Sequence, residues 1–220
     1  MEEHIVSRER VTNHGEVYTQ KREVDAMLDL VKQETERIES RFLEPACGTG
    51  NFLSEIIRRK ISIVEKRYKK SQLEFEKYSI IATSSIYGID ILHDNIEKCR
   101  ERLLDIFLSI YRSLYNKNIK IECINTIKYI YNKNIIWGDA LTLKTVGRNP
   151  EPIIFPEWSF VGENMVKRRD FSFHGLLEHE SFKQLPMFSD LGENVFIPTP
   201  VKEYPLIHYL EIANVERYEL

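Results

Sequence analysis

The segment that most constrains the fold is an apolar run that stops at a proline and continues, through a glycine loop, into an amphipathic helix. Residues 41–44 predict a short strand that ends before Pro45. Gly48 and Gly50 allow the backbone to turn sharply and to approach a ligand closely. A helix is expected from about Asn51, and its free N–H groups would favour an anion. Strand, glycine loop and helix together predict the start of a βαβ unit.

Strands and helices alternate along the rest of the chain up to residue 160. Strands are predicted at 85–90, 134–139 and 152–155, and helices at 21–39, 51–77, 93–115 and 121–131. This alternation predicts an α/β class: a Rossmann-like, mostly parallel sheet with helices on both faces. Residues 1–160 are expected to form this domain with an N-terminal helical segment. Residues 161–220 are expected to be a C-terminal extension with no independent domain.

Carboxylates end the second and third predicted strands. Asp90 lies 40 residues after Gly50, whereas dinucleotide folds place such an acid about 20 residues on. The charged helical stretch 58–77 accounts for the excess as an insertion. Asp90 can accept hydrogen bonds from a ribose diol, or it can cap a helix. Asp139 can accept the amine of an adenine with Leu141 near the ring, or it can end a strand in a turn.

Composition sets limits on location and partners. No apolar run approaches the roughly 20 residues of a membrane span, and the N-terminus lacks the layout of a signal peptide. We therefore expect a cytoplasmic protein without a membrane partner. The net charge of −3 weighs against a chain that grips nucleic acid alone.

Cysteines and histidines give no metal pattern. Three widely spaced cysteines fit neither a zinc site nor a disulfide framework. Cys47, in the glycine loop, is interpreted as a small side chain packed beside the ligand. His174 and His179 are five residues apart, which misses the four-residue spacing of two helical ligands. No metal is expected.

Taken together, these segments resemble a known family. Gly15-Glu16-Val17-Tyr18-Thr19 is similar to the N-terminal cofactor motif of the N6-adenine DNA methyltransferases of restriction-modification systems, with Gln20 in place of that motif's proline. Glu44-Pro45-Ala46-Cys47-Gly48-Thr49-Gly50 is similar to their Asp/Glu-Pro-Ala-Cys-Gly-x-Gly loop. The type I and bifunctional type II members are the most similar, over roughly residues 11–143.

The resemblance implies S-adenosylmethionine as the cofactor. Tyr18 and Thr19 would hold its methionine end, Glu44 and the loop its amino acid portion, Asp90 its ribose and Asp139 its adenine. The implied cofactor-binding residues are Tyr18, Thr19, Glu44, Pro45, Ala46, Cys47, Gly48, Gly50, Asn51, Phe52, Asp90, Ile91, Asp139, Ala140 and Leu141.

The chain departs from the family at its fourth motif, Asn/Asp-Pro-Pro-Tyr/Phe, which holds the target adenine. The nearest counterpart is Phe155-Pro156-Glu157-Trp158. Glu157 would accept the amine and Trp158 would stack on the flipped base as the catalytic pair. The alternative is that Glu157 is exposed and Trp158 belongs to the core.

The implied function is S-adenosylmethionine-dependent methylation of DNA at adenine N6 in a restriction-modification setting. About 60 residues follow Phe160, too few for a separate target recognition domain, so a protein partner is expected to supply it. The alternative is a catalytically inactive, cofactor-binding subunit. Methylation of RNA or protein is also compatible with the fold. The basic cluster Lys167-Arg168-Arg169 is expected near the mouth of the site.

Overall fold

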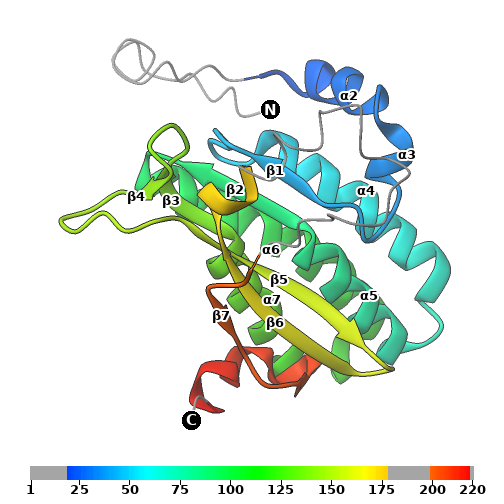
Figure 1. The fold of residues 1–220 in the computed structure, drawn as a ribbon. Coiled ribbons are helices and arrows are strands. Elements are labelled where there is room, and N and C mark those ends of the chain that lie inside the picture. The colour runs from blue at the N-terminus through cyan, green and yellow to red at the C-terminus, as the bar shows by residue number, and fades with distance from the viewer. Residues whose placement is uncertain (1–18, 178–198, 219–220) are drawn as a thin grey trace, which may run out of the picture.

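The computed structural model describes residues 19–177 and 199–218 of the chain. Its first sheet has the order β1-β2-β3-β4, in which β1, β2 and β3 are parallel and β4 is antiparallel to β3. These strands are β1 (Phe42–Glu44), β2 (Ile86–Asp90), β3 (Ile135–Asp139) and β4 (Lys144–Thr145). The predicted α/β class with a mostly parallel sheet is confirmed (Figure 1).

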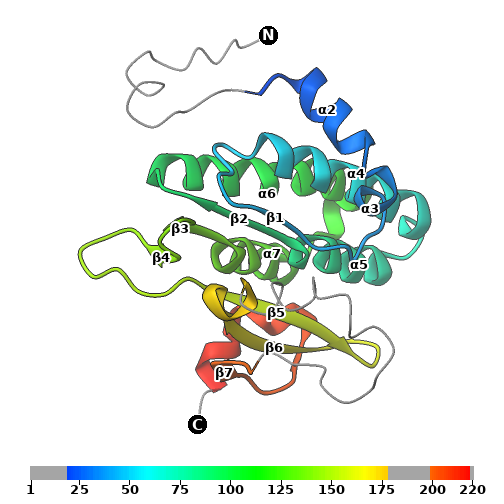
Figure 2. The ribbon, with the colours of Figure 1, turned by 45° about the horizontal axis from the view of Figure 1, so that its top comes forward.

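Pairs of helices connect the parallel strands. α4 (Asn51–Tyr68) and α5 (Gln72–Ser84) lead from β1 to β2, and α6 (His93–Tyr115), the 3-10 turn η1 (Asn116–Asn118) and α7 (Ile121–Asn134) lead from β2 to β3. The stretch interpreted as an insertion is thus the end of one helix and the start of another. Figure 2 shows α4 and α6 on one side of the sheet and α7 on the other.

The N-terminal helix is shorter than predicted. Instead of one helix over 21–39, the chain forms α2 (Lys21–Asp29) and α3 (Lys32–Thr35). The backbone leaves the helical region at Val31, where φ is −119° and ψ is 33°. Val24 and Leu28 are the buried residues of α2, whereas Val31, at the break, is exposed.

The prediction of a fourth parallel strand at residues 152–155 is wrong. These residues lead into β5 (Ile154–Val161), which turns at Gly162 and pairs antiparallel with β6 (Met165–Ser172). A parallel return to the first sheet needs a crossover of a dozen or more residues, usually helical. The stretch from β3 to β5 instead contains β4, Gly147 and two prolines, so no helix forms there.

The second sheet joins residues on both sides of the predicted boundary at residue 160. β6 also pairs with β7 (Lys202–Glu203) and β8 (Ile207–His208), and the 3-10 helix η2 (Tyr209–Tyr218) follows. Side chains after residue 161 belong to the main hydrophobic core, namely Val166, Tyr204, Ile207, Tyr209, Ile212 and Val215. The boundary therefore cuts a hairpin that packs with the rest of the molecule.

A smaller cluster of buried side chains lies between the two sheets. Tyr87 and Ile89 of β2 meet Ile153, Phe155 and Phe173 there. The Tyr87 hydroxyl donates to the carbonyl oxygen of Pro156 at 2.8 Å, and its ring contacts Phe155 edge-on. These contacts fix β5 across the face of the parallel sheet opposite α4 and α6.

A buried lysine joins the beginnings of β1 and β2. The Lys60 ammonium, on α4, donates to the carbonyl oxygens of Ile38 and Ser40 and to Ser85 Oγ. Three acceptors match the three donors of a protonated ammonium. Burial nevertheless lowers the pKa of Lys60 to about 7, because desolvation disfavours the charged form.

Lys60 should make stability depend on pH. The folded pKa lies below the unfolded value of 10.5, so between about pH 7 and 10.5 the unfolded chain binds more protons. The free energy of unfolding should therefore rise with pH in this window, with a contribution approaching about 1.4 kcal/mol per pH unit. Urea unfolding at pH 7.5 and 9.5, in the native chain and in Lys60→Met, measures it. Equal pH slopes in the two proteins would contradict the assignment.

Candidate functional site

Three acidic side chains end the three parallel strands at one edge of the sheet. Glu44 ends β1, Asp90 ends β2 and Asp139 ends β3, and the strands are neighbours in that order. Ligands of open α/β sheets bind outside the carboxyl ends of the strands. Burial raises the pKa of Glu44. The structure thus brings together, from distant parts of the sequence, the acids that the sequence singled out.

The loop after β1 is held in a conformation that depends on its glycines. Gly48 and Gly50 have φ values of 52° and 82°, in the left-handed region. Gly50 is the N-cap of α4, and an added Cβ would lie 2.7 Å from Cys99 Sγ on α6. The second glycine therefore serves both the turn and the close packing of α4 on α6.

Asp90 fastens this loop to the end of β2. Asp90 Oδ2 accepts the N–H of Gly48 at 2.8 Å, and Oδ1 accepts the N–H of Leu92 at 2.8 Å and Asn95 Nδ2 at 3.3 Å. A carboxylate has about four acceptor positions, of which these bonds use three. A ribose diol that donates two hydrogen bonds would have to displace one of them, and the longer Asn95 bond is the weakest.

The first residue of α4 is hydrogen-bonded to the segment before α2 and to α6. Asn51 Nδ2 donates to the carbonyl oxygen of Thr19, and Asn51 Oδ1 accepts from Arg102 of α6 at 2.6 Å. The structure thus places Thr19 beside the glycine loop, while Tyr18 lies outside the described residues. Phe52, one residue into α4, packs against the main core.

Asp139 forms a turn at the end of β3. Its Oδ1 accepts the N–H of Leu141 at 2.8 Å and its Oδ2 accepts the Thr142 hydroxyl at 3.0 Å. The Leu141 N–H lowers the pKa of Asp139, so this carboxyl is ionised. The side chain of Leu141 is 94% exposed, whereas Ala140 packs on the smaller core. These bonds match the alternative interpretation of Asp139 as part of a strand-ending turn. The remaining lone pairs of its carboxylate stay open to a ligand.

An aromatic residue that sequence analysis did not single out lies next to Asp90. Trp137 of β3 is the register partner of Asp90. Its indole N–H donates to the carbonyl oxygen of Ile91 at 2.9 Å, and the His93 ring meets it edge-on. Trp137 and the exposed Ile91 form a fixed apolar wall beside the acid. The sequence feature that could have identified Trp137 is its place as an aromatic residue two positions before Asp139.

Cys47 faces the interior of the protein, while Pro45 and Ala46 are exposed. The Cys47 N–H donates to the carbonyl oxygen of Ile89, and its thiol is buried beside Cys99. The hydrogen bond with Cys99 and the burial raise the pKa of Cys47, so the thiol stays protonated. Such a cysteine packs as a small apolar residue and is not a nucleophile.

The candidate catalytic residues both have structural partners. Glu157 accepts from Arg41 at 2.9 Å and from Arg169 at 2.5 Å, and these bonds lower its pKa despite partial burial. Trp158 is buried, and its indole N–H donates to Asn134 Oδ1 at 3.0 Å. The structure thus places Trp158 in the core, as the alternative interpretation had it, and Glu157 in an ion-paired cluster.

The basic cluster expected at the mouth of the site has acidic partners within the second sheet. Lys167 pairs with Glu203, Arg168 with Asp170, and Arg169 with Glu157. Arg168 is buried, and both of its side-chain pairings with the carboxylate oxygens of Asp170 are 2.8 Å or shorter. None of the three side chains is a free phosphate contact.

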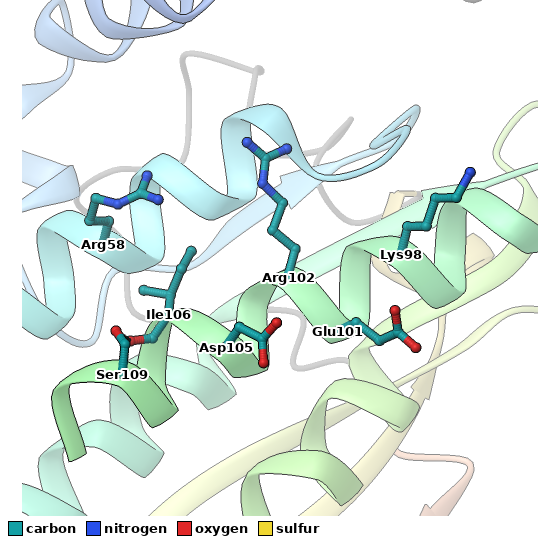
Figure 3. A pocket seen from close by; sticks show the side chains of 7 residues that line it. All are labelled: Arg58, Lys98, Glu101, Arg102, Asp105, Ile106 and Ser109. Atoms are coloured by element: carbon teal, nitrogen blue, oxygen red, sulfur yellow. Dashed lines mark hydrogen bonds between the residues drawn. The ribbon is translucent and has the colours of Figure 1, made fainter. Parts of the chain in front are cut away.

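A shallow hollow lies between α4 and α6 (Figure 3). It is lined by Arg58, Lys98, Glu101, Arg102, Asp105, Ile106 and Ser109. Its charges are mixed, and none of the predicted cofactor residues lines it. Arg102 connects it to the glycine loop through Asn51.

Within residues 19–177 and 199–218, no group of three His, Cys, Asp or Glu side chains is arranged to hold a metal ion. His179 lies outside these ranges. None of the helices described is long and apolar enough to span a membrane.

Comparison with known proteins gave no matching family model, no matching curated protein and no matching solved structure.

Proposed function

We propose that the carboxyl edge of the parallel sheet binds S-adenosylmethionine and that the chain is the cofactor-binding part of an adenine-N6 DNA methyltransferase. The observation that carries the proposal is the convergence of Glu44, the glycine loop, Asp90 and Asp139 at neighbouring strand ends. The strand order β3-β2-β1 is that of the first half of a doubly wound, Rossmann-like sheet. A ligand in such a fold lies across these strand ends.

Each part of the cofactor finds a suitable group at this edge. The amino acid portion would lie at the glycine loop, where α4 offers free N–H groups to the carboxylate and Glu44 a charge for the ammonium. Asp90 would accept from the ribose. The adenine would lie against Ile91 and Trp137, with Asp139 within reach of its amine. The three carboxylates also suit the positive sulfonium.

Within the part of the chain that the structure describes, neither residue expected to hold the target base is free to do so. Glu157 is engaged by two arginines and Trp158 is enclosed in the core. Together with the net charge of −3, these observations support a division of labour in which a protein partner contacts the DNA and completes the site. They equally favour the second candidate, a cytoplasmic subunit of a restriction-modification system that holds the cofactor without chemistry.

Labelled cofactor separates these functions. The chain, alone and with the products of its neighbouring genes, is incubated with methyl-labelled S-adenosylmethionine and unmethylated DNA, then irradiated to attach bound cofactor. We expect labelled protein in both samples and labelled adenine only with the partner. Labelled protein without labelled DNA in either sample would establish the binding subunit. If neither protein nor DNA carries label, the proposal fails.

The same assay examines Glu157. If this residue only pairs with Arg41 and Arg169, Glu157→Gln should leave methyl transfer in the complete system within about twofold, because glutamine keeps a carbonyl acceptor for the arginines and no contact with the target base is lost. A loss of transfer with retained cofactor labelling would restore Glu157 as the acceptor for the target amine. Thermal unfolding of the variant serves as the control for folding.

A further inference from the structure

Arg102 extends from α6 to the point where the glycine loop becomes α4 (Figure 3). Its Nη1 donates to Asn51 Oδ1 at 2.6 Å and approaches the carbonyl oxygen of Thr49 at 3.5 Å. The side chain is half-buried, so water competes only in part for these bonds. A short bond from a charged donor is stronger than a bond between neutral groups. The contact with Asn51 is therefore the firmest connection between α6 and the loop.

Arg102 determines which way the Asn51 amide faces. A guanidinium has donors and no acceptor, so the amide must turn its oxygen toward α6. The amide nitrogen then faces the opposite side, where it donates to the carbonyl oxygen of Thr19 at 3.3 Å. This second bond is longer and joins two neutral groups, so it is the weaker restraint on the amide. The orientation of Asn51, and with it the attachment of Thr19, therefore depends on Arg102.

The bonds from Arg102 through Asn51 to Thr19 join three segments that are distant in the sequence. Thr19 precedes α2, Asn51 is the first residue of α4 and Arg102 belongs to α6. They meet at the carboxyl edge of the parallel sheet, where Gly50 is the N-cap of α4. One side-chain amide thus connects the glycine loop to the segment expected to hold the methionine end of the cofactor.

The position of Arg102 is unfavourable for the stability of α4. The amino end of a helix carries a partial positive charge, which acidic side chains stabilise and cations destabilise. α4 has no acidic residue in its first turn and no side-chain cap, and a guanidinium lies beside Asn51 instead. Departures from such local rules are typical of functional sites. This observation favours a role for Arg102 in positioning over one in stabilising the helix.

We propose that Arg102 is a positioning residue for the cofactor: it orients the Asn51 amide, and the amide holds Thr19 against the glycine loop. The role in cofactor binding rests on the proposed function, whereas the control of the amide rests on the hydrogen bonds themselves. Arg102 does not need to touch the cofactor. Its removal should therefore lower the affinity through Asn51 alone.

The side-chain amide of Asn51 reports this role directly, in the isotope-labelled chain without cofactor. Its NMR signal is identified by its absence from Asn51→Ala. In Arg102→Met, which keeps an aliphatic stem but no donor, the signal should shift and its nitrogen relaxation should indicate a mobile amide. The matched control is Lys98→Met, because Lys98 lines the same hollow one turn earlier and donates to Asp94. A native signal in Arg102→Met, or an equal change in Lys98→Met, would overturn the proposal.

Cofactor affinity then tests whether Arg102 acts through Asn51. Arg102→Met and Asn51→Ala should each weaken the binding of S-adenosylmethionine about tenfold, because each releases Thr19. The double variant should bind no more weakly than the weaker single variant, since both changes break the same chain of bonds. Additive losses, or native affinity in Arg102→Met, would refute the positioning role. If the native chain itself does not bind, the proposed function fails, and the amide signal, measured without cofactor, distinguishes the two failures.

Discussion

Replacement of Asp90 by alanine is expected to weaken the binding of S-adenosylmethionine by about 10- to 100-fold. Hydrogen bonds to a charged group contribute roughly 1.5–3 kcal/mol, and about 1.4 kcal/mol corresponds to a factor of ten. The change also removes the acceptor for the Gly48 N–H, so the glycine loop loses its fastening to β2. Titration calorimetry on the folded variant measures the affinity.

Two variants separate the roles of Asp90. Asp90→Asn keeps one carbonyl acceptor for the backbone and removes the charge, so it should bind more tightly than the alanine variant and more weakly than the native chain. Asp139→Ala, at an exposed carboxylate, should cost less affinity than Asp90→Ala because its bonds compete with water. Unchanged affinity in folded Asp90→Ala would refute the ribose assignment.

The second large effect is expected at Gly50. Gly50→Ala should lower the free energy of unfolding by about 2–4 kcal/mol and abolish cofactor binding. The residue has a φ of 82°, which strains any other side chain. Its new Cβ would lie 2.7 Å from Cys99 Sγ in a packed interior. Urea unfolding and the same calorimetric titration provide the two readouts.

The chain offers matched controls for this prediction. Gly48 and Gly162 also have positive φ values, of 52° and 63°, but nothing lies within 4 Å of an added Cβ at either position. Alanine there should cost only the backbone strain, about 1–2 kcal/mol. The double variant Gly50→Ala with Cys99→Ala should recover part of the lost stability. An equal cost at all three glycines would contradict the packing role of Gly50.

Local sequence patterns were sufficient to predict the elements around the candidate site. Two strands, ending at Glu44 and at Asp90, were predicted from apolar runs that a proline or an acid terminates. Each of these signals extends over only a few residues. The helix from His93 to Tyr115 follows from its own apolar periodicity. Asp90 and Asp139 could be paired in advance because parallel strands end at the same edge.

Long-range pairing was not predictable in the same way. The sequence of an apolar segment such as β5 is the same whether the strand joins a parallel sheet or a hairpin. Its pairing with β6, which its own residues do not reveal, determines which of the two forms. The burial of Arg168 depends on Asp170 together with Tyr204, whose ring lies 4.1 Å from the guanidinium carbon. A run of three basic residues shows only charge, so these partners could not be inferred from it and the cluster was predicted near the mouth of the site.

The same limit applies to the catalytic candidates. Phe155-Pro156-Glu157-Trp158 was matched to a motif by its place after a predicted fourth strand, and that strand is part of a hairpin. With the strand reassigned, the positional argument for Glu157 and Trp158 disappears, although the cofactor residues are unaffected. Among the described residues, no fourth parallel strand lies on the side of β1 that faces away from β2.

Direct titration of the unaltered chain tests the central claim, which is that the carboxyl edge of this sheet holds a methyl donor. Calorimetry with S-adenosylmethionine and, separately, with NAD requires no partner and no DNA. We expect saturable binding of S-adenosylmethionine with a Kd on the micromolar scale or weaker, corresponding to about −8 kcal/mol or less in magnitude, and no binding of NAD. No heat with S-adenosylmethionine, or binding of NAD instead, would contradict the account.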